Sequence, residues 1–204
     1  MLTLFKVGGP FMYVLVLTSI VGLTFIIERG WALRWRKVVP VEVEKAVEDC
    51  QSPEGVPELR QICKLKPSPL SHLLLIAAEH LHWPIDENTD AIQTRARHEI
   101  LQLERGLVVL EIVVGIAPLL GLVGTVHGLI TLFGDLSTVG LGDNSAFARG
   151  ISEALYTTLA GLLIAIPALV AWSYYTKKVE SMGVEMETLC DEFLRRQYRH
   201  PKAG

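Results

Sequence analysis

The chain has 204 residues, 50% of them hydrophobic and 20% charged, and its mean hydropathy is +0.36. This composition is too apolar for an ordinary soluble domain, and it suits a membrane protein with a sizeable aqueous portion. A net charge of −3 does not favour non-specific binding to nucleic acid or to an anionic surface. The three cysteines lack metal-ligand or disulfide spacing, so we expect free thiols.

Three apolar segments are long enough to cross a membrane. Their charge-free stretches hold 18, 22 and 23 residues: Pro10 to Ile27, Ile112 to Phe133 and Ala154 to Thr176. About 20 residues are needed to cross ~30 Å of hydrocarbon. With their flanks, the predicted spans are residues 10–28, 107–133 and 149–176. We interpret the first as a retained span rather than a signal peptide, because Glu28-Arg29 follows it and no small-residue cleavage site is present.

Lysine and arginine residues predict how the chain is oriented. Four basic residues follow closely after the C-terminal end of the first span: Arg29, Arg34, Arg36 and Lys37. Lys177 and Lys178 close the third span, whereas the connector 134–148 carries only uncharged and acidic residues. The positive-inside rule then places residues 1–9 and 134–148 on the outer side of the membrane, and residues 29–106 and 177–204 in the cytoplasm.

The region Val38 to Gly106 is polar, helix-prone and interrupted by prolines. Apolar periodicity predicts one amphipathic helix from Ser71 to His82 and another from Asp86 to Gly106. Since no breaker precedes Leu107, we expect the second of these helices to continue into the membrane. We also expect the third span to continue as a helix through Val179 to Tyr198. The predicted fold is all-α, with the second and third spans extended into the cytoplasm.

The second and third spans each carry small and hydroxyl-bearing residues on one helical face. At 100° per residue, this face holds Ala117, Gly121, Gly124, Thr125 and Gly128 in the second span, and Gly150, Ala154, Thr157, Thr158, Gly161, Ala165 and Ala168 in the third. A helix in lipid gains nothing by exposing glycine and hydroxyl groups to acyl chains. These faces are therefore expected to meet protein or water.

Thr125 and Thr158 are predicted to lie at one depth in the membrane. At about 1.5 Å per residue, Thr125 lies about 12 Å before Phe133, and Thr158 lies about 13 Å beyond Arg149. Paired hydroxyls both donate and accept, so they can relay a proton or hold the water that does so. Neither titrates near neutral pH, so a carboxylate has to carry the charge change, and Glu153 is the nearest candidate. The alternative for these threonines is a hydrogen bond back to a carbonyl of their own helix.

The sequence resembles the ExbB/TolQ/MotA family of ion-channel stator subunits, and most of all its three-span ExbB and TolQ type. The matching stretches are Gly8-Gly9-Pro10, Glu28-Arg29, Leu103-Glu104-Arg105-Gly106-Leu107, Ala117–Gly128 and Ile151–Pro167. The resemblance implies a homopentamer in the bacterial inner membrane, whose second and third spans line a central pore. It also implies a dimer of a single-span ExbD/TolR-like partner in that pore, bearing a membrane aspartate, and a TonB-like energy-transducing protein as a further partner.

The resemblance also assigns roles to residues of the two spans. Thr125 and Thr158 match the family's pore threonines, Glu153 its pore glutamate, and Pro118 and Pro167 its helix-bending prolines. We add Thr157 to the predicted proton pathway. The predicted pore-packing residues, which would admit the central helices, are Gly121, Gly124, Gly128 and Gly161.

His127 stands where ExbB-like chains often have an aromatic residue. Its side chain is expected about 160° away from Thr125 around the helix, which places it off the ion path.

The predicted function is that of a pore-forming stator subunit, which converts proton motive force into mechanical work through its single-span partner. We predict no enzyme activity, cofactor or metal. Two alternatives remain: a non-conducting membrane scaffold and a Na⁺-driven member of the same family. An intramembrane hydrolase using His127 and a serine has little support, because Ser19 and Ser152 lie on other spans without a supporting motif.

Overall fold

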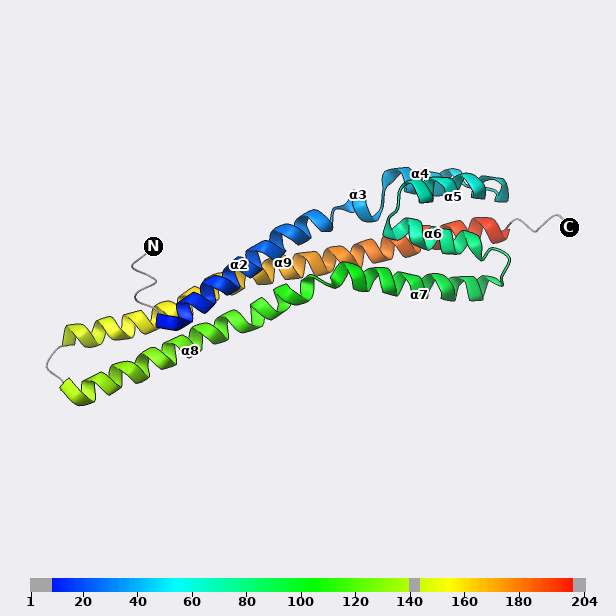
Figure 1. Ribbon diagram of the computed structural model, residues 1–204. Helices are drawn as coiled ribbons and strands as arrows, with labels where there is room; N and C mark the ends of the chain where they lie inside the picture. Colours follow the sequence, from blue (N-terminus) through cyan, green and yellow to red (C-terminus); the bar gives the residue numbers. More distant parts are fainter. Residues whose placement is uncertain (1–8, 140–143, 200–204) are drawn as a thin grey trace. The chain divides into compact units, whose positions relative to one another are not determined.

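The computed structural model describes residues 9–139 and 144–199, and every regular element in them is helical (Figure 1). The predicted all-α class is confirmed. In chain order the elements are α2 (Gly9–Ala32), α3 (Trp35–Val38), α4 (Val41–Asp49), the 3₁₀ helix η1 (Pro53–Gly55), α5 (Val56–Leu65), α6 (Pro69–Glu79), α7 (Ile85–Glu104), α8 (Leu107–Val139) and α9 (Asn144–Arg199).

Three helices are long and apolar enough to cross a membrane, within the residues described. They are Pro10–Ala32 in α2, Leu107–Gly134 in α8 and Gly150–Arg199 in α9. The three predicted spans fall on these helices. Helix α9 has 56 residues, more than twice the roughly 20 that a bilayer requires. The expected continuation of the third span through Tyr198 as one helix is confirmed.

The second span does not continue the preceding helix, and that prediction was wrong. Helix α7 ends at Glu104, Arg105 and Gly106 form a turn, and α8 begins at Leu107. The side chain of Arg29, on α2, packs directly against Gly106, where a Cβ atom would collide with the guanidinium group. Glycine already costs about 1 kcal/mol relative to alanine inside a helix. A contact with a side chain far away in sequence therefore coincides with the point where the helix is interrupted.

The first compact unit comprises Met1–Arg29 and Gly106–Tyr174. Helix α2 runs antiparallel to α8: the ring of Phe11 contacts that of His127, while Gly22 lies against Val113. Helix α8 in turn runs antiparallel to this part of α9, as contacts between Gly128 and Ala154 and between Ala117 and Gly161 show.

The second unit comprises Gly30–Arg105 and Tyr175–Gly204. Helix α4 packs on α5, α5 on α6 and α6 on α7, and the C-terminal part of α9 lies among them (Figure 1). Its apolar core includes Val43, Val47, Leu59, Leu73, Leu74, Met182, Met186 and Phe193. Burying such side chains supplies most of the stability of a helical bundle. The side chain of Arg196 ties α9 to the end of α4, donating to the carbonyl oxygens of Val47 at 3.0 Å and Glu48 at 3.1 Å.

Helix α6 confirms the helix predicted from Ser71 to His82, although it begins two residues earlier, at Pro69, and ends three residues earlier, at Glu79. The Ser68 hydroxyl accepts a hydrogen bond from the backbone N–H of Ser71 at 3.1 Å, and Pro69 occupies the first helical turn. Both are standard signals for a helix N-terminus. Helix α7 confirms the second predicted helix, within two residues at each end.

Candidate ion pathway between α8 and α9

Glycine residues allow α8 and α9 to approach at backbone distance. A Cβ atom added to Gly161 would lie 2.5 Å from the carbonyl oxygen of Ala117. One added to Gly124 would lie 2.9 Å from the Thr157 Cβ, and one added to Gly121 would lie 2.8 Å from the Thr157 carbonyl oxygen. Any larger side chain would force the helices apart. Because lipid removes the hydrophobic drive for helix association, this close packing is what holds the pair together.

The predicted division of α9 into a small face and a large apolar face is confirmed. Ala154 is 3% exposed, Thr157 is 2% exposed and Ala168 is 1% exposed. The opposite face is exposed and holds Leu155, Leu159, Leu162, Leu163, Ile166 and Val170. Gly121, Gly124, Gly128 and Gly161 thus serve the contact between two helices of the same chain. Their predicted second role, admitting central helices of a partner, stays a prediction.

Three hydroxyl groups meet at this contact, Thr125 from α8 and Thr157 and Thr158 from α9. The Oγ1 atoms of Thr125 and Thr158 are directly hydrogen-bonded. The Oγ1 atoms of Thr125 and Thr157 lie 3.3 Å apart. The prediction that Thr125 and Thr158 share one level is confirmed. We call these three residues the threonine cluster.

Two backbone carbonyl groups complete the threonine cluster. The carbonyl oxygen of Gly121 lies 3.2 Å from the Oγ1 atoms of Thr125 and Thr158, and 3.1 Å from that of Thr157. The carbonyl oxygen of Ala154 lies 3.0 Å from Thr125 Oγ1 and 2.7 Å from Thr157 Oγ1. Sequence reasoning missed both acceptors, since every residue carries a carbonyl. The available signal was the small size of these two residues, which lets the opposite helix reach the backbone.

The cluster offers more acceptors than it has protons to donate. A hydroxyl donates only one hydrogen, yet each of Thr125 and Thr157 lies within bonding distance of several oxygens. Of the two threonines for which a bond to the own helix was the alternative above, Thr125 makes such a bond, to the Gly121 carbonyl, and the carbonyl near Thr158 belongs to the other helix. Thr157 also bonds to its own helix, at the Ala154 carbonyl. These bonds compete with bonds across the helix pair. Such a network has more than one donor arrangement of similar geometry, which a proton relay requires.

The remaining predicted residues of the pathway lie along the same two helices. Pro118 lies inside α8 and Pro167 inside α9. Each proline lacks the N–H that would otherwise bond the carbonyl four residues earlier, at Val114 and Leu163 respectively. Glu153 belongs to α9, but its side chain lies outside the described residues.

His127 is turned away from the threonine cluster. Its ring is exposed and meets Phe11 of α2 edge to face, with the ring centroids 5.4 Å apart. Thr125, two residues earlier on α8, instead bonds to α9. The predicted separation of these two side chains around the helix is confirmed.

Within the described residues, three helices long and apolar enough to span a membrane, with a hydroxyl cluster between the last two, define an integral membrane protein with a polar connection inside it. The sequence model of the MotA/TolQ/ExbB proton channel family matches residues 70–188. The chain belongs to this family.

Individual relatives agree with this assignment. An ExbB-like protein of Synechocystis sp. is 37% identical over 175 residues, which are 82% of this chain and 67% of the relative. An ExbB homolog of Methanothermobacter thermautotrophicus is 31% identical over 181 residues, 88% of this chain and 64% of the relative. The Tol-Pal system protein TolQ of Pseudomonas aeruginosa is 36% identical over 103 residues, 50% of this chain and 45% of the relative. The chain thus matches between about half and two thirds of the length of these relatives.

Proposed function

We propose that this chain is the pore-forming stator subunit of a proton channel, and that the threonine cluster is part of the proton path. The observation that carries the proposal is the direct hydrogen bond between Thr125 and Thr158 within the apolar part of two spanning helices. Packing alone needs only small residues at this contact, and the glycines already supply them. Three interacting hydroxyls add a polar connection that packing does not require.

The hydroxyls move protons only in cooperation with a group that changes charge. Threonine does not ionise near neutral pH, so a carboxylate has to take up and release the proton. Glu153 on α9 is the candidate within this chain. A single-span partner of the ExbD/TolR type would supply a second, an aspartate at membrane depth. The adjacent reading frame is expected to encode such a short, single-span protein.

Assembly into a homopentamer fits the surfaces that α8 and α9 leave exposed. Both helices present large apolar side chains outward, among them Leu122, Val126, Leu159 and Ile166. In a ring, these faces would contact lipid and neighbouring copies, and the partner dimer would occupy the centre.

The proposed location is the bacterial inner membrane, with the N-terminus periplasmic and the C-terminus cytoplasmic, because basic residues follow the first and third spans. Mechanical work would then reach the cell envelope through the partner and a TonB-like protein.

Substitutions at Thr158 test the proposal against a scaffold that does not conduct. The assay is proton uptake into liposomes that contain the chain and its partner, under an imposed pH gradient. Thr158→Val removes the hydroxyl and should reduce proton uptake at least tenfold with the ring intact, whereas Thr158→Ser keeps the hydroxyl and should retain most of it. The matched control is Thr131→Val on α8, because among the described residues that exposed hydroxyl bonds back to the His127 carbonyl at 3.1 Å and to no other group.

The same preparation separates the remaining alternatives. Uptake that follows a Na⁺ gradient and ignores the pH gradient would assign the chain to the Na⁺-driven type. If the Thr158→Val variant takes up protons at the wild-type rate, the chain is better explained as a membrane scaffold that does not conduct protons.

A further inference from the structure

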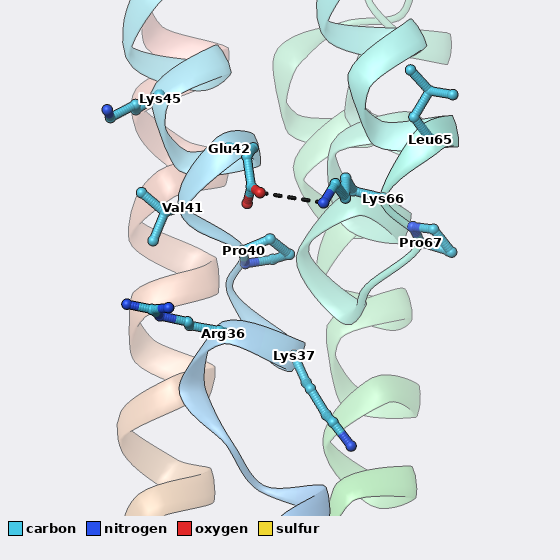
Figure 2. A pocket seen from close by; sticks show the side chains of 9 residues that line it. All are labelled: Arg36, Lys37, Pro40, Val41, Glu42, Lys45, Leu65, Lys66 and Pro67. Carbon is cyan, nitrogen blue, oxygen red and sulfur yellow. Dashed lines mark hydrogen bonds and ion pairs between the residues drawn. The ribbon is translucent and has the colours of Figure 1, made fainter.

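A pocket of about 790 Å³ lies in the second unit, between the start of α4 and the end of α5 (Figure 2). Its polar lining holds four basic residues and a single carboxylate: Arg36, Lys37, Lys45, Lys66 and Glu42. The rest of the lining is Pro40, Val41, Leu65 and Pro67. We call it the basic pocket. The chain as a whole has a net charge of −3, so this local excess of positive charge runs against the general composition.

Of the four basic side chains that line the basic pocket, only Lys66 forms an ion pair with another residue of the lining. Lys66 Nζ lies 3.2 Å from Glu42 Oε1, and the dashed line in Figure 2 joins these two side chains. The pKa of Glu42 is held below its ordinary value by hydrogen bonds from its own backbone amide and from Lys66, and by the charges of Lys66 and Arg36, so the carboxylate is ionised. Lys37 and Lys45 form no ion pair within the described part of the chain. A bound anion would therefore meet uncompensated positive charge.

The basic pocket is close to the end of a membrane span along the chain. Helix α2, which contains the candidate span Pro10–Ala32, ends four residues before Arg36. Four residues reach at most about 14 Å. Trp31, in the last turn of α2, is 67% exposed and Trp35, at the start of α3, is 40% exposed, and exposed tryptophans are typical of the membrane–water interface. The guanidinium of Arg34 lies 5.8 Å from the centroid of the Trp31 ring. These residues indicate that the chain passes the headgroup layer here.

Apolar side chains at the same pocket favour a lipid over a free anion. Leu65 is 71% exposed and Val41 is 43% exposed, beside the basic residues. A soluble phosphate compound would leave these two side chains in water. The glycerol and upper acyl region of a phospholipid would cover them.

We propose that the basic pocket binds the phosphodiester headgroup of an anionic phospholipid, in the leaflet at the C-terminal end of α2. Arg36, Lys37 and Lys45 supply the positive charge that attracts the phosphate, Lys66 is shared with Glu42, and Leu65 and Val41 contact the glycerol region. The bound lipid would hold α3 and α4 at the membrane surface. This inference depends on membrane insertion and is independent of proton conduction.

The test is native mass spectrometry of the full chain, purified in detergent and titrated with dioctanoyl phosphatidylglycerol. Dioctanoyl phosphatidylcholine and inorganic phosphate are titrated in parallel. Phosphatidylglycerol should bind at least tenfold more tightly than phosphatidylcholine. The double variant Lys37→Gln/Lys45→Gln should weaken phosphatidylglycerol binding about 30-fold, since each cation near a membrane surface contributes roughly fivefold. It leaves Arg29, Arg34 and Arg36 to preserve topology.

Two matched variants separate a specific site from general attraction. The control Lys64→Gln/Arg97→Gln removes two exposed cations outside the basic pocket and should change binding less than twofold. Glu42→Gln removes the opposing carboxylate and should tighten binding. Equal losses in the pocket and control variants, or no loss in the pocket variant, would overturn the proposal. So would inorganic phosphate that displaces the lipid at equal concentration, because the pocket would then be a site for soluble anions.

Discussion

The hydroxyl oxygen of Thr125 lies 3.0 Å from the carbonyl oxygen of Ala154, on the neighbouring helix of the same chain. Residues this far apart in sequence come so close only because glycines remove the side chains between the two helices. The features that let α8 and α9 pack are therefore the same ones that bring the hydroxyls together. We expect the proton path to follow the seam between these two helices within each chain.

The first prediction concerns Gly161, at the tightest point of that seam. Gly161→Ala would place a Cβ atom 2.5 Å from the Ala117 carbonyl oxygen, which the backbone of α8 cannot avoid without moving. We expect a loss of about 2–3 kcal/mol in the free energy of unfolding, as for other overpacked contacts. Reversible unfolding by denaturant in detergent measures it.

The matched control is Gly115→Ala on α8, because a Cβ atom there meets nothing within 4 Å. Alanine is the better helix former, so this variant should be neutral or more stable by up to about 1 kcal/mol. Equal effects of the two substitutions would show that the seam is not tightly packed.

Much of this seam could be predicted from residue spacing alone. The 100° period placed Thr157, Gly161 and Ala168 on one face of α9, and the rise per residue placed Thr125 level with Thr158. Both follow from helix geometry, which a long apolar segment enforces. The sequence did not reveal that these faces pack on each other within one chain, since the same stripes also suit contacts between chains.

The parts that sequence reasoning missed depend on contacts between distant segments. The interruption at Gly106 coincides with the packing of the Arg29 side chain, and a single glycine in a helical pattern does not distinguish a break from a tolerated residue. Likewise, the basic pocket joins residues of α4 to Lys66, after α5. The short helices α4 and α5 were not separately predicted, because prolines divide that region into segments too short for clear periodicity.

The second prediction concerns Cys63, which lies in the core of the second unit. Burial raises the pKa of its thiol to about 11, and the thiolate is the reactive form. With the other cysteines replaced by alanine, Cys63 should react with a maleimide at pH 8 at least 100-fold more slowly than an exposed thiol, and the rate should rise with pH. A cysteine introduced at the neighbouring exposed position, Lys64→Cys, is the control. Comparable rates in the folded protein would contradict the buried position.

The third prediction concerns Glu99, a carboxylate whose side chain is 4% exposed. It lies 2.6 Å from Arg95 Nη2 on α7 and 3.0 Å from His72 Nδ1 on α6. Glu99→Ala would leave Arg95 without its buried partner, so we expect a loss of about 2–3 kcal/mol in the free energy of unfolding.

Glu180→Ala provides the comparison, because the pair between Glu180 and Lys177 is exposed on both sides. It should cost less than about 0.5 kcal/mol. If the two variants unfold at the same denaturant concentration, the contact between α6 and α7 through Glu99 stabilises the fold no more than an exposed ion pair does, which would contradict the prediction.

The central claim is that Thr125 and Thr158 act together in moving protons, and a double-mutant cycle of proton uptake into liposomes tests it most directly. Residues that act as one unit show strongly non-additive effects. We predict that Thr125→Val and Thr158→Val each reduce uptake at least tenfold, and that the double variant is no slower than either single variant, with assembly unchanged. Wild-type uptake by the double variant, or reductions that simply multiply, would contradict the account.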